Sequence, residues 1–357
     1  MSNLIKGRCL LMCPEKERWT REKEGLLHRL EIDEKTKGRK RPKADPEKIV
    51  KCFSRPAAGQ SMTDPEQLRP APVLLLTIRY LLTKVAPRID FDWVYIYDFI
   101  FDRLRSVRQD IVIQRISGRT AIQLYEPIVR FLICSAQRLI ERQISEYDSK
   151  INKQHLSECI KHLLVLYDEI DARDINADTE LSLCLEKMSL SNNRPEMEAA
   201  YILLYMGDVD ALNRALHLSK SLRESPEVQL ATKISLAWYL KNYVRVCSLS
   251  QQLPPLLICA IMINLQNLRR TTLKIMSAGY NSKTLTFPGL KLQKLLLYKD
   301  IEKIRADCKL FGLTFTDENV LFQKSNFKDE ITLASPEMYY SAEVLHNFLP
   351  YILLQSQ

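Results

Sequence analysis

The chain has 357 residues, enough for two or three domains, and its 46% hydrophobic and 27% charged residues are typical of ordinary soluble proteins. Its nine glycines are about 2.5% of the chain, against roughly 7% on average, and no two lie within eight residues of each other. Phosphate-cradling loops need closely spaced glycines, so this spacing argues against a nucleotide-binding enzyme. The net charge is +9, which suits contact with nucleic acid or an acidic protein.

Residues 1–60 are predicted to form a basic arm with one short helix. They hold 16 lysines and arginines against 9 acidic residues, and thus carry +7 of the net charge. The basic run at 35–43 is either a nuclear-import or nucleic-acid patch or a solvated linker. Its candidate binding residues are Lys35, Lys37, Arg39, Lys40, Arg41 and Lys43.

Two other features of the arm have competing interpretations. Trp19 either stacks on a base or, as we favour, anchors the arm on its own domain. Cys9, Cys13, His28 and Cys52 do not have the spacing of a zinc knuckle, so we expect buried free thiols and no metal. Nine scattered cysteines without a CxxC pair, and an N-terminus without a secretory apolar region, predict a reducing compartment.

Residues 61–275 are predicted to be helical throughout. The stretches 194–216 and 225–249 resemble each other at an offset of 31 residues, and each is predicted as a helix, a short turn and a second helix. The turns fall at Gly207-Asp208 and Lys241-Asn242. This pattern predicts a mostly α fold, in which stacked helical hairpins of the tetratricopeptide kind form a right-handed superhelix.

The stretch DRLRSVRQD (102–110) lies on a predicted amphipathic helix. A core-facing stripe runs along that helix, and Arg103 and Asp110 lie near its edge. Unpaired buried charge is costly, so we expect these two residues to form a structural ion-pair network with Glu126 and Arg130 of a neighbouring helix. The remaining arginines either contact a partner or phosphate or form a solvated face, and they are Arg105, Arg108 and Arg115.

Residues 276–335 are predicted to form a winged helix, and residues 336–357 a C-terminal helix. Two short helices precede a segment at 319–327 that is predicted as a strand pairing with residues 313–316. Basic residues in this part either contact phosphates or lie beside a protein–protein interface, and the candidates are Lys291, Lys294, Lys303 and Lys324.

Several motifs in order resemble the GANP family, which shares the conserved domain of the leucine-permease transcriptional regulator. The N-terminal motif GxCxxMCPExExxxRE is matched from Gly7 to Glu22. KCFSRPAAG (51–59) matches a second motif, with Pro56 where the family usually has serine, and DRLRSVRQDIVIQ and EPIVRF (126–131) match two more. The chain is most similar to the small, domain-only members of the family.

The resemblance implies a non-catalytic PCI-like scaffold, a helical superhelix capped by a winged helix. It implies as partners a PCI-domain protein and a small acidic protein of a nuclear mRNA-export complex, or centrosomal proteins in centrosome duplication and spindle assembly during cell division. The implied locations are nucleus and cytoplasm, with the centrosome and spindle as a further place. No cofactor and no small-molecule substrate are implied.

A nucleic-acid-binding module in transcription-coupled processes, using the basic arm and the winged helix, is the alternative function. An enzyme ranks third, because the sequence lacks GxGxxG, GxxxxGK[ST], GxSxG and HExxH motifs. No membrane association is expected, since the longest apolar run, 256–263, is far too short to span a bilayer.

Overall fold

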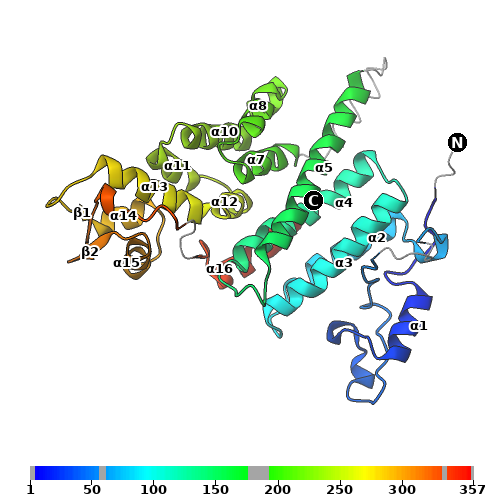
Figure 1. The fold of residues 1–357 in the computed structure, drawn as a ribbon. Helices are drawn as coiled ribbons and strands as arrows, with labels where there is room; N and C mark the ends of the chain where they lie inside the picture. The colour runs from blue at the N-terminus through cyan, green and yellow to red at the C-terminus, as the bar shows by residue number, and fades with distance from the viewer. Residues whose placement is uncertain (1–4, 56–61, 176–192, 332–335, 355–357) are drawn as a thin grey trace. The chain divides into compact units, whose positions relative to one another are not determined.

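The computed structural model describes residues 5–55, 62–175, 193–331 and 336–354, and they are mostly helical, which confirms the predicted class (Figure 1). The chain divides into two compact units. The first unit comprises Met1–Phe131, Glu158–Ser191 and Leu349–Gln357. The second comprises Leu132–Ser157 and Asn192–Phe348.

The N-terminal segment of the first unit is built around one short helix, α1 (Glu15–Glu24). Acidic residues lie in its first turn and basic residues in its last, which complements the helix dipole. Gly25 ends it in the left-handed conformation with φ of +71°. Three 3-10 turns follow along the chain, η1 (Arg29–Glu31), η2 (Glu34–Thr36) and η3 (Pro65–Gln67).

Helix α3 (Trp93–Ile113) is the long amphipathic helix that carries DRLRSVRQD. It is preceded by α2 (Ala71–Tyr80), which runs on into a π-helical turn, η4 (Leu81–Val85). The side chain of Asp92 caps α3 by accepting from the Val94 amide at 2.8 Å. The predicted core-facing stripe of α3 is buried, which confirms the prediction. The stripe consists of Ile96, Ile100, Leu104, Val107 and Ile111.

Helices α4 (Gly118–Arg138) and α5 (Ser149–Ile175) contribute residues to both units. Gly118 opens α4 with φ of +64°, a conformation that favours glycine. The Asp148 carboxylate accepts from the Lys150 amide at 2.8 Å and so starts α5. Across the ranges that the structure describes, no helix is both long and apolar enough to cross a membrane.

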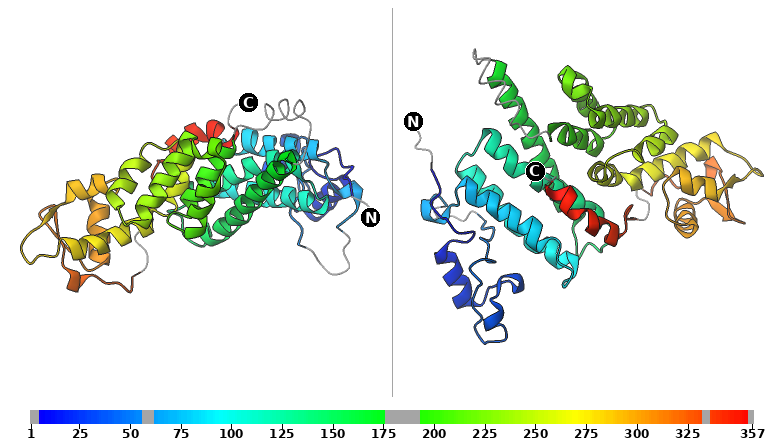
Figure 2. Two further views of the ribbon diagram at one scale, coloured as in Figure 1. Left: turned by 90° about the horizontal axis from the view of Figure 1, so that it is seen from above. Right: turned by 180° about the vertical axis from the view of Figure 1, so that it is seen from behind.

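The predicted helix–turn–helix pairs are present in the second unit. The first is α7 (Arg194–Leu204) with α8 (Val209–His217), and the second is α10 (Pro226–Tyr239) with α11 (Tyr243–Ser250). A short helix, α9 (Lys220–Arg223), joins them. Helix α10 packs against α7, α8 and α11, so the two hairpins lie side by side (Figure 2).

The two hairpin turns use the same chemistry. Gly207 and Lys241 have φ of +79° and +59°, and each precedes a residue that caps the next helix. Asp208 accepts from the Ala211 amide at 3.1 Å, and Asn242 accepts from the Arg245 amide at 3.1 Å. This equivalence agrees with the weak sequence repeat.

A small sheet forms near the end of the second unit. Its strands β1 (Phe287–Pro288), β2 (Thr314–Thr316) and β3 (Asn319–Leu321) pair antiparallel in the order β1-β3-β2. Helices α14 (Gly289–Leu295) and α15 (Ile301–Leu310) lie between β1 and β2 in sequence. The predicted pairing of β2 with β3 is confirmed, whereas β1 was missed because it has two residues and one is proline.

The remaining elements complete the second unit and the C-terminus. Helix α12 (Pro255–Met262) packs on α7 and is buried from Leu256 onward. Helix α13 (Leu265–Gly279) follows it. A 3-10 turn, η5 (Lys324–Asn326), comes after β3, and α16 (Ala342–Leu354) is the C-terminal helix.

Candidate interaction surface

Arg103 of α3 is held by carboxylates within the first unit. Its side chain is buried, with the residue 5% exposed, and its Nη2 donates to Glu31 Oε1 at 3.0 Å. Glu31 lies on η1 and is fully buried, and it also accepts from Arg21 of α1 and, at 3.0 Å, from the Val50 amide. Each buried charge therefore has an opposite charge and hydrogen bonds, which is what makes its burial tolerable.

Asp110 is held in a similar way, two turns further along α3. It is 0% exposed, and its two oxygens accept from Lys51 Nζ and Arg69 Nε, each at 2.7 Å. Arg69 also donates to Ser106 Oγ at 2.9 Å. We call the two networks together the clasp, and its residues are Arg21, Glu31, Lys51, Arg69, Arg103 and Asp110.

The partners of Arg103 and Asp110 differ from those predicted. Glu126 and Arg130 are buried on α4, but neither contacts Arg103 or Asp110 by an ion pair. Glu126 instead accepts from the Tyr167 hydroxyl at 2.6 Å. Helical periodicity identifies the buried face of α3, but the segment that covers this face is the N-terminal one, and Glu31 is 72 residues away from Arg103 in the chain.

The N-terminal family motif fixes the same segment in place. The Gly7 amide donates to Gln114 Oε1 at 2.8 Å, and a Cβ at Gly7 would lie 2.4 Å from the Leu68 carbonyl oxygen. Glu17 accepts from the Cys52 amide at 2.8 Å. The N-terminal motif, KCFSRPAAG and DRLRSVRQD thus meet in one structural cluster, although Pro56 of KCFSRPAAG lies outside the described residues.

Burial disfavours the thiolate form of the arm's cysteines, Cys9 and Cys13 being buried and Cys52 half-buried. Burial raises the pKa of the Cys9 and Cys13 thiols, and it raises the pKa of Cys52 to about 12. Cys13 packs with Ala44 and Ile49 in a small apolar cluster. In the described ranges, no group of three or more His, Cys, Asp or Glu side chains is arranged to hold a metal.

The six cations of the basic run are all exposed. Lys37 pairs with Glu34 at 3.0 Å and Lys43 with Glu22 at 2.9 Å. The other four make no ion pair with any described residue, and they are Lys35, Arg39, Lys40 and Arg41. Exposed charges of this kind remain available to a polyanion.

The arginines on the remaining faces of α3 are mostly engaged within the chain. Arg105 is half-buried, with its guanidinium carbon 3.8 Å from the centroid of the Phe53 ring. Arg108 donates to Glu158 at 3.1 Å. Arg115 is exposed just beyond the helix, with φ of +53°. These three residues therefore do not form one common cationic surface.

The four candidate lysines of the second unit lie on three short elements, α14, α15 and η5. Lys291 and Lys294 are exposed on α14 and Lys324 is exposed on η5, whereas Lys303 on α15 is half-buried. Acidic side chains lie nearby in sequence and are also exposed, as at Glu302. The candidates thus belong to two separate sets, one in each unit.

Trp19 does not anchor the arm, contrary to the favoured prediction. It is 61% exposed, while Arg21 two positions later is buried in the clasp. At 100° per residue these two side chains lie about 160° apart around α1, so the inward position goes to the charged residue. Nothing in the local sequence indicates that Arg21 is buried on α1 and Trp19 is exposed.

Sequence reasoning missed several partners in these networks. Glu31 and Arg69 carry no local pattern that marks them as buried, and the motif that begins at Lys51 does not indicate that Lys51 pairs with Asp110. In the second unit, buried Arg269 donates to the Leu296 carbonyl at 3.1 Å, and its guanidinium carbon lies 3.7 Å from the Tyr298 ring centroid. Only interactions between residues far apart in the chain identify these positions.

Stacked helical hairpins, and a signature whose Arg103 and Asp110 form internal ion pairs, define the chain as a mostly helical protein. The chain matches the SAC3/GANP family over residues 12–317 and belongs to that family, as the resemblance indicated.

Relatives from distant eukaryotes agree with this assignment. SAC3 family protein 1 of Schizosaccharomyces pombe is 27% identical over 88% of this chain, and Protein xmas of Drosophila melanogaster is 30% identical over 69%. SAC3 family protein B of Arabidopsis thaliana is 26% identical over 78%. The matched regions span only 30%, 11% and 16% of these relatives, in that order.

Proposed function

We propose that this chain is a non-catalytic, PCI-like scaffold that binds protein partners in nuclear mRNA export. The observation that carries the proposal is the family match over residues 12–317, together with the helical hairpins of the second unit. The order α13, β1, α14, α15, β2, β3 is that of a winged helix, which supports a superhelix capped by such a domain. The charged signature is occupied by the clasp and is not free for catalysis.

The proposed partners are a PCI-domain protein and a small acidic protein, and the proposed contact is between two winged helices. Exposed apolar side chains support this contact. Leu285 before β1 is 76% exposed, and Leu290 on α14 and Tyr280 after α13 are exposed as well. Apolar residues at such positions favour association with another protein. The proposed locations are nucleus and cytoplasm.

Co-purification tests this contact directly. The full chain is co-expressed with a PCI-domain protein and a small acidic protein, and the complex is followed by size-exclusion chromatography. Leu285→Asp with Leu290→Asp is expected to abolish the complex, whereas Leu26→Asp, at an exposed leucine of the first unit, is expected to leave it intact. An unchanged complex with the double variant overturns the winged-helix contact, and no complex with the wild-type chain overturns the export assignment.

Affinity purification from dividing cells distinguishes the two proposed settings. Recovery of a PCI-domain protein together with a small acidic protein supports export work. Recovery of centriolar proteins instead supports a role in centrosome duplication and spindle assembly, which is the alternative setting implied by the small family members.

We propose nucleic-acid binding as a second function, because four cations of the basic run make no ion pair with the described residues. Phosphate contacts by lysine and arginine give affinity that falls with salt. The test replaces Lys35, Arg39, Lys40 and Arg41 by serine and follows binding of single-stranded RNA by fluorescence anisotropy. The log–log slope of affinity against salt is expected to weaken by about 0.7 for each phosphate that the variant no longer binds. Binding that ignores both salt and these substitutions overturns the second function.

A further inference from the structure

Trp19 is held on the outside of the N-terminal segment. The other two tryptophans, Trp93 and Trp238, are buried, whereas Trp19 is 61% exposed. The opposite face of α1 is fixed, because Arg21 is locked to Glu31 in the clasp. Turning the helix to bury the indole would break this buried ion pair, so the indole is exposed while the Arg21–Glu31 pair is intact.

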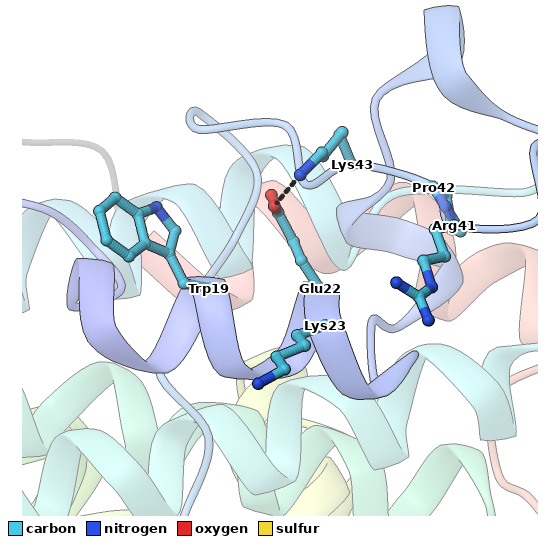
Figure 3. A pocket seen from close by; sticks show the side chains of 6 residues that line it. All are labelled: Trp19, Glu22, Lys23, Arg41, Pro42 and Lys43. Carbon is cyan, nitrogen blue, oxygen red and sulfur yellow. Dashed lines mark hydrogen bonds and ion pairs between the residues drawn. The ribbon is translucent and has the colours of Figure 1, made fainter.

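The indole borders a hollow between α1 and the basic run. Trp19, Glu22 and Lys23 lie on one face of α1 at spacings of three and four residues. Arg41, Pro42 and Lys43 line the hollow from the basic run (Figure 3). Its volume is about 330 Å³, at the lower end of the range for small-ligand sites.

The carboxylate in the hollow, Glu22, is ionised and already paired with Lys43. Partial burial tends to raise the pKa of Glu22, but hydrogen bonds from Lys43 Nζ at 2.9 Å and the Ala44 amide at 3.0 Å hold it below the ordinary value. This ion pair ties the basic run to α1. Lys23 and Arg41 are exposed and make no ion pair with the part of the chain described here, so the hollow has three cations against one carboxylate.

An exposed indole beside unpaired cations matches the chemistry of an unpaired nucleotide. A base offers a π-face that stacks on an aromatic ring, and its flanking phosphates attract lysine and arginine. A duplex offers the phosphates, but its bases are already stacked on one another. An acidic peptide offers negative charge without the flat aromatic surface that the indole requires.

We propose that this hollow binds one nucleotide of single-stranded RNA or DNA, with the base stacked on Trp19 and the flanking phosphates on Lys23 and Arg41. The inference rests on the second proposed function, binding of nucleic acid by the basic run, and adds to it a base-stacking position. Stacking depends little on base identity, so the site holds unpaired strands without reading their sequence.

The experiment separates the base from the phosphates. Fluorescence anisotropy at fixed ionic strength compares a labelled oligouridylate with an abasic strand of the same length, using the full chain. Trp19→Ala is expected to weaken binding of oligouridylate about 5- to 150-fold and to leave binding of the abasic strand unchanged. Trp19→Phe is expected to restore most of the affinity, because phenylalanine retains a stacking ring.

A second readout is tryptophan fluorescence. Oligouridylate is expected to quench the emission of the wild-type chain, and Trp19→Ala is expected to abolish that quenching, since the other two tryptophans are buried. Leu26→Ala is the matched control, because Leu26 has the same 61% exposure close to the end of α1. Oligodeoxythymidylate in place of oligouridylate tells whether the site prefers RNA or DNA.

Each remaining outcome overturns the stacking proposal. If Trp19→Ala binds oligouridylate as the wild type does, while the serine variant of the basic run binds it more weakly, nucleic-acid binding stands and stacking fails. If Trp19→Ala weakens binding of the abasic strand equally, the indole has a structural role only. If polyglutamate binding shows the same dependence on Trp19, the occupant is an acidic peptide. If the wild-type chain binds no strand, both proposals fail.

Discussion

Two basic stretches of the first unit lie in opposite environments. DRLRSVRQD (102–110) on α3 and KTKGRKRPK (35–43) in the N-terminal segment are both rich in lysine or arginine. In the first, Arg103 and Asp110 are buried and paired. In the second, all six cations are exposed, and four make no ion pair with any residue the structure describes.

The difference teaches that a charged motif shared with a family can be structural. The stretch on α3 is one of several motifs that resemble the SAC3/GANP family, and Arg103 and Asp110 in it hold the N-terminal segment against the helix. The basic run carries no specific motif, yet its cations are exposed and can contact another molecule. Whether a charge is available depends on the opposite charges near it in the folded chain, and Arg103 meets Glu31 from 72 residues away.

The largest effect is expected from opening the clasp. Glu31→Ala leaves Arg21 and Arg103 without their shared carboxylate, and removal of one partner of a buried ion pair costs about 3–5 kcal/mol. Urea denaturation measures the change in the free energy of unfolding. Glu31→Gln keeps the side chain's size and gives a smaller decrease, in case the alanine variant does not fold.

The matched control for the clasp comes from the basic run. Lys37→Ala removes an exposed ion pair with Glu34 and is expected to change the free energy of unfolding by less than about 1 kcal/mol. If Glu31→Ala costs as little as Lys37→Ala, then the two stretches do not differ in the way described.

The next effect compares the basic run with the lysines of the second unit. Serine at Lys35, Arg39, Lys40 and Arg41 is expected to lower the log–log salt slope of RNA binding by about 2 to 3, since each phosphate bound contributes about 0.7. Serine at Lys291, Lys294, Lys303 and Lys324 is expected to lower it less, because exposed carboxylates such as Glu302 dilute the charge there. Equal slopes for the two variants contradict this ranking.

A smaller effect is expected from substitution of Arg105, which should change stability and not RNA affinity. Its guanidinium lies over the Phe53 ring, so Arg105→Ala is expected to cost about 0.5–1 kcal/mol of stability and to leave RNA affinity unchanged. Thermal or urea denaturation and anisotropy give the two values. A decrease in RNA affinity without a decrease in stability would instead assign Arg105 to the binding surface.

The smallest effect is a pH dependence next to the clasp. Burial, followed by the nearby Arg103 guanidinium, lowers the pKa of His28 from 6.5 to about 4, and its ring stacks on Tyr95 at 4.5 Å. A lowered pKa means that folding favours the neutral imidazole, so this contribution is complete above pH 6.5 and is lost as pH falls toward 4. The wild-type chain is expected to lose more stability across this interval than His28→Asn, which keeps an acceptor for the Leu30 amide. Parallel curves for the two proteins would rule out this role.

Much of the fold was predictable because its causes are local. The stripe from Ile96 to Ile111 follows from helical periodicity, and the turns at Gly207 and Lys241 follow from polar caps after a break in the pattern. Strand β1 was missed, because two residues that include a proline give no periodic pattern.

The candidate site was predictable only in part. The exposed cations of the basic run agree with its composition, since breakers and charges rarely form a core. The exposure of Trp19 was not predictable, because burial of Arg21 on the other face of α1 depends on a carboxylate from another turn. The environment of Arg105 was not predictable either, because its guanidinium packs on the ring of Phe53, which is distant in the sequence.

The sequence by itself determined the helical class, the hairpin repeat, the paired strands β2 and β3, and membership of the SAC3/GANP family. These properties depend on residues within a few turns of each other, or on motifs in order along the chain. Only the tertiary structure decided which charges are internal and which are offered to other molecules. The reason is distance along the chain: Arg103 meets Glu31 across 72 residues and Asp110 meets Lys51 across 59, and no local pattern encodes such a choice of partner.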